Sequence, residues 1–324
     1  MDNVLSIQNI SASLRIGRKY YSVLKDVSFS LEQGSVLGIV GESGSGKSVL
    51  MKFIMQLMDP AISRIDEGRI CLEGQEITRL SDREMTQLRG NRISMIFQEP
   101  MTSLNPVLTC GDQMSEALMA HAKMSHVEAM KQAEKMLELV GVPNAKARLS
   151  AYPHELSGGM RQRVMIGMAL LTSPAVLLAD EPTTALDPTI QAQILAIIRD
   201  LQKQMNMAVL FVTHDLGVVS SLCQRVAVMY FGTIVEEADT EELFRAPLHP
   251  YTQGLLDAAP KLIENRELLS SIPGSVPPLY TPPSGCPFHA RCSKALPVCA
   301  VEFPAETWPA SGHRVRCHLY HKEG

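Results

Sequence analysis

The sequence predicts an α/β fold built on a mainly parallel sheet. Three short runs, at residues 36–40, 175–179 and 208–212, are apolar throughout, which is typical of strands that are buried on both faces. Helical spacing of apolar residues separates them, as at residues 190–201. Because buried strands that alternate with helices build parallel sheets, we expect helices to cover this sheet. The 324 residues suffice for one large domain and a smaller appendage.

The segments before and between these strands have different patterns. The first 35 residues alternate apolar and polar, as in Val27-Ser28-Phe29-Ser30-Leu31, which predicts antiparallel strands. Residues 47–57 and 160–171 are expected to be helices, and residues 93–97 a further strand. A helix over residues 126–140 would have one apolar face, made of Val127, Met130, Ala133, Leu137 and Val140. The stretch from about 100 to 172 is mostly helical in pattern and predicts a helical subdomain.

The composition changes after about residue 260. Residues 272–287, IPGSVPPLYTPPSGCP, are rich in Pro and Gly and can continue neither a helix nor a strand pattern. We therefore predict a boundary that separates residues 1–258 from a C-terminal extension, residues 259–324.

Charge and hydropathy exclude several classes of protein. The net charge of −4 does not favour a general nucleic-acid binder. No apolar run reaches the about 20 residues of a membrane helix, and the first residues, MDNVLSIQNISASL, lack the pattern of a signal peptide. We expect a cytosolic chain whose role at a membrane, if it has one, depends on a partner.

A glycine-rich loop follows the strand at residues 36–40. Its sequence, GESGSGKS, fits the phosphate-binding pattern G-x-x-x-x-G-K-[ST] with Gly41, Glu42, Ser43, Gly44, Ser45, Gly46, Lys47 and Ser48. Glycines let backbone N–H groups converge on phosphate oxygens, and the following helix presents its positive end. Lys47 would reach the β- and γ-phosphates, and the Ser48 hydroxyl would bind Mg²⁺.

Two adjacent acids follow the apolar run at residues 176–179. Asp180 would emerge at the carboxyl edge of the sheet, where open α/β sheets bind ligands, and would hold Mg²⁺ directly or through water. Glu181 is then free to act as the general base that polarises an attacking water. An exposed charge at a strand end is the alternative interpretation of Glu181.

Further motifs place the chain in a family. Residues 156–163, LSGGMRQR, resemble the signature motif of ABC-type ATPases, with Met160 at its variable fifth position. Gln98 resembles the Q-loop glutamine, Ala185-Leu186-Asp187 the D-loop and His214 the switch histidine. These motifs occur in the order and spacing of the family over roughly residues 4–240. The resemblance implies a P-loop ABC ATPase domain with a mixed core sheet, an antiparallel β subdomain and a helical subdomain.

The resemblance also implies roles for residues. Two such subunits pair head to tail, and each ATP lies between one P-loop and the partner's signature residues and D-loop, which here are Ser157, Gly158, Gly159 and Asp187. Gln98 would contact Mg²⁺ or the attacking water, and His214 would contact the γ-phosphate. An aromatic residue of the N-terminal sheet stacks on adenine in most members; Tyr21 is the candidate and Tyr20 the alternative.

Two longer stretches narrow the branch. Residues 98–106, QEPMTSLNP, and 246–252, APLHPYT, resemble segments of the peptide-permease ATPases. This resemblance implies an ATPase at the cytoplasmic face of the inner membrane that energises import of di- and oligopeptides. Its implied partners are a second, non-identical ATPase subunit, two transmembrane permease subunits and an extracytoplasmic solute-binding protein, with no nucleic acid. The alternatives are an importer of nickel or another small solute in the same branch and, more distantly, a soluble ABC ATPase that does not act in transport.

Four of the seven cysteines gather near the end of the chain with the spacing C-x5-C-x6-C-x17-C. In a reducing cytosol, such a group indicates metal more than disulfides. The spacing resembles the [4Fe-4S] site of some peptide-importer ATPases, whose ligands would be Cys286, Cys292, Cys299 and Cys317. Zn²⁺, with His289 or His318 replacing a thiolate, and no metal at all are the alternatives.

Overall fold

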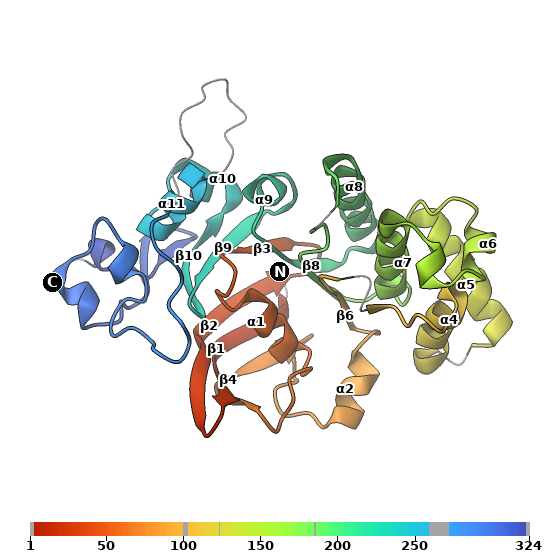
Figure 1. Cartoon of the computed structure of the whole chain (residues 1–324), viewed down its shortest axis with the longest axis horizontal. Coiled ribbons are helices and arrows are strands. Elements are labelled where there is room, and N and C mark those ends of the chain that lie inside the picture. The colour runs from red at the N-terminus through yellow and green to blue at the C-terminus, as the bar shows by residue number, and fades with distance from the viewer. Residues whose placement is uncertain (1–2, 100–102, 123, 185, 259–271, 322–324) are drawn as a thin grey trace. The chain divides into compact units, whose positions relative to one another are not determined.

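The computed structural model describes residues 3–99, 103–122, 124–184, 186–258 and 272–321 (Figure 1). The chain divides into two compact units. We call residues 6–30, 36–78 and 212–324 the P-loop unit, and residues 1–5, 31–35 and 79–211 the helical unit. The predicted domain boundary after residue 258 adjoins residues 259–271, which lie outside the described ranges. This boundary therefore stays a prediction.

The N-terminal residues form the antiparallel strands that the alternating pattern predicts. A four-stranded sheet has the order β2-β1-β4-β5. Its strands are β1 (Asn3–Ile16), β2 (Lys19–Glu32), β4 (Ser63–Leu72) and β5 (Gln75–Glu76). Apolar side chains are buried at alternate positions over residues 5–7 and 10–12 of β1 and residues 27–31 of β2, because successive side chains of a strand point to opposite faces. The alternation shifts at Asn9 and Asp26, which have positive φ angles.

A second, mixed set of strands carries the P-loop. Strand β3 (Val36–Val40) is buried at every position and pairs in parallel with β9 (Arg225–Tyr230). From β9, the sheet continues through β10 (Thr233–Asp239) and β12 (His313–Val315) to β11 (Thr307–Ala310), each pair antiparallel. The sheet is therefore mixed, as the family resemblance implies, because a tight two-residue turn returns the chain directly from β9 to β10.

That turn has a clear local cause. Phe231 and Gly232 connect β9 to β10, and both have positive φ angles, 47° and 79°. Positive φ at both central residues defines a type I′ turn, whose twist matches an antiparallel hairpin. The helices of this unit are α1 (Lys47–Ile54), α9 (Leu216–Leu222), α10 (Thr240–Arg245) and α11 (Pro250–Ala258). Helix α1 ends before the predicted residue 57, since Gln56 has a φ of 50°.

The helical unit combines strands and a helical cluster. Strands β8 (Ala208–Thr213), β7 (Val176–Asp180) and β6 (Ile93–Ile96) are neighbours in that order, and β6 and β7 are parallel. Helices α4 to α7 gather in Figure 1 as the predicted helical subdomain. The helices are α2 (Asp82–Leu88), α4 (Cys110–His121), α5 (His126–Leu139), α6 (Ala145–Leu149), α7 (Gly158–Leu170) and α8 (Pro188–Met205), with a 3-10 turn at Pro153–Glu155.

Helix α5 buries a slightly different face from the one predicted. Ala133, Leu137 and Val140 are buried as expected, but Val127 is 64% exposed. The capping box of Ser125 and Glu128 starts the helix just before Val127, so this residue lies in the first turn. The buried stripe begins two residues later, at Ala129.

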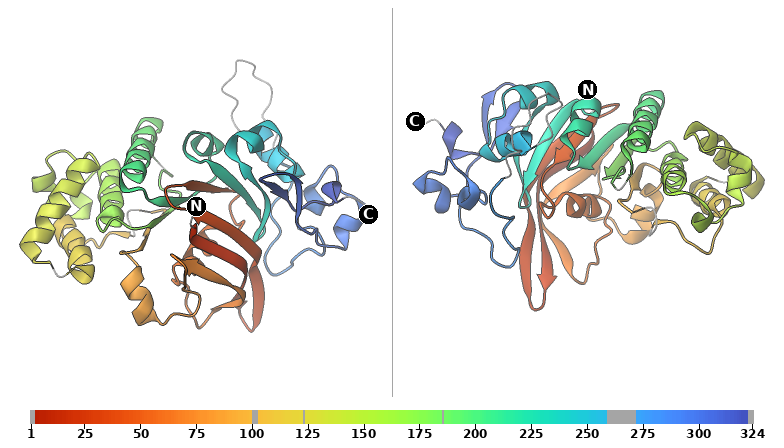
Figure 2. Two further views of the ribbon diagram at one scale, coloured as in Figure 1. Left: turned by 180° about the vertical axis from the view of Figure 1, so that it is seen from behind. Right: turned by 45° about the horizontal axis from the view of Figure 1, so that its top comes forward.

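The C-terminal extension is irregular but joined to the sheet. Its described residues, 272–321, contain β11, β12 and the 3-10 turns η2 (His289–Arg291), η3 (Pro297–Ala300) and η4 (His318–Tyr320). In Figure 2 the blue C-terminal segment lies against the sheet, where β12 pairs with β10 and β11 pairs with β12. The buried Glu236 of β10 accepts a hydrogen bond from His313 Nε2 at 2.8 Å, and Arg314 Nε donates to Glu237 at 3.0 Å. Part of the predicted separate module is therefore an edge of the core sheet.

Candidate nucleotide site

The P-loop spans the junction between β3 and α1, as the motif predicts. Lys47, which is 5% exposed, folds back over the loop and donates from Nζ to the carbonyl oxygens of Gly41 (2.7 Å) and Glu42 (3.0 Å). Gly41 permits a close approach of backbone, because a Cβ atom there would lie 2.2 Å from the Met229 carbonyl oxygen. The loop thus wraps around the start of α1, where backbone N–H groups bind anions.

One polar atom in this loop suits a phosphate. Within the described residues, the Ser45 hydroxyl is buried and has no hydrogen-bond partner. Buried hydroxyls are normally paired, so an unpaired one in a phosphate-binding motif fits a site that a phosphate oxygen completes. Because Ser45 and the converging amides both fit the group, the residues of this chain are compatible with a bound nucleotide.

Two contacts that the sequence did not predict hold the P-loop at Ser45 and Glu42. Gly232 of the β9–β10 turn donates its N–H to the carbonyl of Ser45 at 2.8 Å. The Tyr251 hydroxyl accepts the N–H of Glu42 at 2.8 Å. Burial raises the pKa of Tyr251, so this hydroxyl keeps its proton. These residues are more than 180 positions from the loop along the chain, and no local pattern could have found them.

Glu181 and Gln98 meet in the helical unit. Asp180 ends β7 and is 4% exposed. Thr184 Oγ1 donates to Glu181 Oε2 at 2.8 Å, and Gln98 Nε2 donates to the same oxygen at 3.4 Å. Glu181 also has a positive φ of 44°. Such backbone strain in a residue other than glycine concentrates at functional sites, so it favours the functional interpretation of Glu181 over a simple strand-end charge.

The predicted signature residues begin a helix. Ser157 is the N-cap of α7, and its hydroxyl accepts the N–H of Met160 at 3.3 Å. A Cβ atom at Gly158 would meet nothing within 4 Å, so the backbone is accessible at this helix start. The buried Gln162 donates to the carbonyl of Pro182, a contact that ties α7 to the residue after Glu181 and that the sequence did not reveal.

The remaining nucleotide residues are placed as follows. Asp187 caps α8 by accepting the N–H of Ile190 at 3.0 Å, while Ala185 lies outside the described residues, as do residues 100–102 of the Q-loop extension. His214 directly follows β8 and is exposed. The Arg64 guanidinium lies 4.2 Å from the centre of the Tyr20 ring, whereas Tyr21 is half-buried; the adenine-stacking assignment stays a prediction.

The residues divide between the two units. Residues 41–48, His214 and both tyrosines belong to the P-loop unit, and Gln98, Asp180, Glu181, Asp187 and residues 157–159 belong to the helical unit. Within the units, the structure brings together Lys47 with the P-loop carbonyls and Gln98 with Glu181.

In the described residues, the cysteine group is not arranged as a metal site. Burial, and then neighbouring thiols, raise the pKa of Cys286 and of Cys317 to about 11 each, so without a metal both thiols keep their protons at neutral pH. His289 and His318 instead contact backbone carbonyl oxygens, at 2.7 and 2.9 Å. In the part of the chain that the structure describes, no three His, Cys, Asp or Glu residues are arranged to hold a metal ion. The predicted [4Fe-4S] cluster therefore lacks structural support.

Across the described ranges, no helix is both long enough and apolar enough to span a membrane.

Comparisons with known proteins agree with these motifs. The family described as "ABC transporter" matches residues 24–184, and the family described as "Oligopeptide/dipeptide transporter, C-terminal region" matches residues 235–299. The dipeptide transport ATP-binding protein DppD of Bacillus subtilis (strain 168) is 48% identical, covering 98% of this chain and 95% of that protein. The oligopeptide transport ATP-binding protein AppD of the same organism is 45% identical, covering 100% and 99%.

A solved structure supports the fold. A dimeric ATP-binding cassette in a post-hydrolysis state, bound to ADP and Pi, has a TM-score of 0.66 and 28% identity over 73% of this chain and 98% of that chain. The P-loop, the signature helix and the two family matches lead to one conclusion. The chain belongs to the ABC transporter family, in the branch of ATP-binding proteins that carry the oligopeptide/dipeptide transporter C-terminal region.

Proposed function

We propose that this chain is the ATP-hydrolysing subunit that energises import of short peptides. The observation that carries the proposal is the P-loop, in which Lys47 and the buried Ser45 hydroxyl line a backbone cradle at the start of α1. The relatives named above are a dipeptide and an oligopeptide transport ATP-binding protein, which supports peptides as the solute.

The P-loop residues bind and orient the nucleotide. Residues 41–46 offer backbone N–H groups to phosphate oxygens, and Lys47 supplies a positive charge near them. Ser48, Gln98 and Asp180 are the proposed Mg²⁺ ligands. When bound, Mg²⁺ neutralises charge on the phosphates.

Glu181 is the proposed general base. Its carboxylate accepts hydrogen bonds from Thr184 and Gln98 at one oxygen, and these contacts orient the side chain that would take a proton from water. Gln98 therefore positions Glu181, and His214 is proposed to contact the γ-phosphate. Removing a general base typically slows a reaction by about 10²- to 10⁴-fold.

We also propose a partner for the signature. Ser157, Gly158 and Gly159 present an accessible helix start, which suits the phosphates of an ATP held by a second subunit's P-loop. The dimeric cassette structure supports such pairing. Two permease subunits and an extracytoplasmic solute-binding protein would complete the importer, and the chain would lie at the cytoplasmic face of the inner membrane.

The decisive substitution is Glu181→Gln. It removes the base but keeps the shape and both hydrogen-bond donors to the side chain. We expect ATP binding close to wild type and turnover reduced at least about 10²-fold, measured by nucleotide titration and phosphate release. Thr184→Val is the matched control, since it removes one donor to Glu181 and leaves the base. Wild-type turnover by Glu181→Gln would exclude Glu181 as the base.

Uptake measurements identify the solute. Cells whose only copy carries Glu181→Gln are given labelled di-, tri- and pentapeptides and labelled nickel. We expect peptide uptake to be lost while nickel uptake continues. Loss of nickel uptake alone would replace the solute while leaving the residue roles unchanged.

The cysteine prediction needs its own measurement, because the structure does not support a metal there. Iron, sulfide and zinc are quantified in protein purified without oxygen, beside Cys292→Ser. Stoichiometric iron and sulfide in the wild-type protein that are lost in the variant would restore the [4Fe-4S] prediction. Stoichiometric zinc would select the zinc alternative. Absence of iron, sulfide and zinc from the wild-type protein would exclude both the cluster and the zinc site.

A further inference from the structure

Glu42 is an acid inside the phosphate-binding loop, and each of its polar groups is held. Its carbonyl accepts from Lys47 Nζ, and its N–H donates to the Tyr251 hydroxyl. Its carboxylate accepts two hydrogen bonds from Arg291, from Nη1 to Oε2 at 2.6 Å and from Nη2 to Oε1 at 2.9 Å. A two-point arginine–carboxylate pair is strong and fixes orientation.

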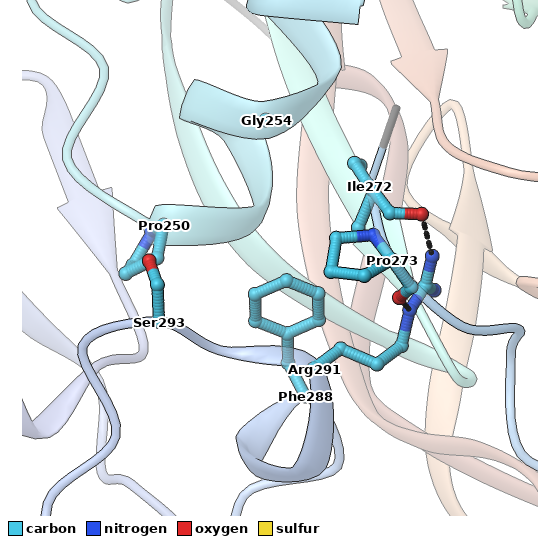
Figure 3. Close-up of a pocket in the computed structure, with 7 residues that line it drawn as sticks. All are labelled: Pro250, Gly254, Ile272, Pro273, Phe288, Arg291 and Ser293. Carbon is cyan, nitrogen blue, oxygen red and sulfur yellow. Dashed lines mark hydrogen bonds between the residues drawn. The ribbon is translucent and has the colours of Figure 1, made fainter. Parts of the chain in front are cut away.

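Arg291 comes from the C-terminal extension and is itself fixed. Its side chain is 6% exposed, and its Nε donates to the carbonyl of Pro273 at 2.8 Å. Figure 3 shows Arg291 beside Phe288 in a pocket that Pro250 and Ile272 also line. The Glu42 carboxylate raises the pKa of Arg291, so the guanidinium stays charged.

Aromatic packing anchors the turn that carries Arg291. The Phe288 ring, three residues earlier, lies 5.3 Å from the rings of both Tyr230 and Tyr251, measured between centroids. Tyr230 ends β9 and Tyr251 begins α11, so the turn η2 packs on elements of the core. Arg291 therefore reaches Glu42 from a rigid support.

Charge explains why this contact matters for a nucleotide. A carboxylate in the loop that receives phosphates repels them, and water screens this repulsion only in part, since the Glu42 side chain is 30% exposed. A guanidinium bound to that carboxylate cancels its charge at close range. Without Arg291, Glu42 would present an unpaired negative charge beside the triphosphate.

We propose that Arg291 is a positioning residue through which the C-terminal extension neutralises Glu42 and makes the P-loop competent for a nucleoside triphosphate. The inference deepens the proposed function and rests on the assignment of residues 41–48 as the ATP site. Arg291 acts through Glu42 and touches neither ATP nor the reacting water.

A double-mutant cycle tests this role with Arg291→Gln, Glu42→Gln and the combined variant. We expect Arg291→Gln to weaken ATP affinity about tenfold, within the usual range for coupled neighbours. Glu42→Gln should bind ATP as tightly as wild type or more tightly. The combined variant should recover most of the affinity, because no unpaired carboxylate is left. In steady-state ATP hydrolysis, Arg291→Gln should raise the KM for ATP with little change in kcat.

Two comparisons separate charge from mere support of the fold. The loss in Arg291→Gln should be larger for ATP than for ADP, since the repulsion grows with phosphate charge. If Arg291→Gln loses affinity and the combined variant does not regain it, the charge role is wrong. If Arg291→Gln is too unstable to purify, Glu42→Gln still decides: a clear loss of ATP affinity in it overturns the proposal.

The control Lys47→Ala distinguishes the proposal from the proposed function. If Lys47→Ala binds ATP normally, residues 41–48 are not the nucleotide site and the function itself fails. If Lys47→Ala loses ATP while Arg291→Gln binds it like wild type, the site stands and only the inference about Arg291 is overturned.

Discussion

His249 predicts a loss of stability in mild acid. The residue is 1% exposed, and its Nδ1 accepts the N–H of Tyr251 at 3.0 Å. Burial lowers the pKa of His249 to about 4, although the charge of Glu236 acts in the opposite direction. The imidazole is therefore neutral in the folded protein, where it helps to place Tyr251 against the P-loop.

The sign and size of the effect follow from the two pKa values. An unfolded histidine has a pKa of about 6.5, so between about pH 6.5 and about 4 the unfolded chain binds a proton that the folded chain does not. Stability contributed by this group is complete above about pH 6.5 and is lost as the pH falls toward 4. The difference of about 2.5 units corresponds to about 3 kcal/mol in total, of which about 2 kcal/mol is lost by pH 5.

Urea unfolding at about pH 7.5 and about pH 5 measures this loss of stability, with His249→Asn as the matched control. The Asn side-chain oxygen can accept the Tyr251 N–H but does not titrate. We expect the variant to be less stable than wild type at about pH 7.5, and this gap to narrow by about 2 kcal/mol at about pH 5. An unchanged gap would refute the argument that His249 is held neutral by burial.

Two other substitutions test the support of the P-loop. Tyr251→Phe removes the acceptor of the Glu42 N–H; we expect it to lower the free energy of unfolding by about 1–3 kcal/mol and to weaken ATP binding, and unchanged values of both would show that this hydrogen bond is dispensable. Gly232→Ala would place a Cβ atom 2.3 Å from the Val23 carbonyl at a φ of 79°, so thermal unfolding should occur at a markedly lower temperature. Gly74→Ala, with a φ of 80° and nothing within 4 Å, is the matched control and should lose only about 1 kcal/mol; equal losses would mean that strain alone, and not the contact with Val23, limits Gly232.

Local features could be read from the sequence. The P-loop at residues 41–48 was found from spacing alone, because a phosphate cradle is built from consecutive backbone amides and one helix start. The strand at residues 36–40 was predicted with its observed bounds, since a short apolar run flanked by glycines has few other structures available to it. The place of Asp180 at the end of β7 followed from the same reasoning.

Other local predictions failed where one residue sets the end of a helix or of its buried face. Helix α1 stops before residue 57 because Gln56 adopts a left-handed conformation, which its residue type does not announce. Val127 fits the helical period but lies in the first turn of α5, where it is exposed. Periodicity shows which residues share a face, and only packing shows where that face ends.

The tertiary structure alone decided how the C-terminal extension relates to the P-loop. The sequence determined the family, the nucleotide motifs and the change in composition near residue 260, all of which depend on neighbours along the chain. It could not show that β12 extends the core sheet or that Arg291 binds Glu42, a residue 249 positions away. Such pairs depend on the path of the whole chain, because folding alone brings distant charges together and removes the water between them.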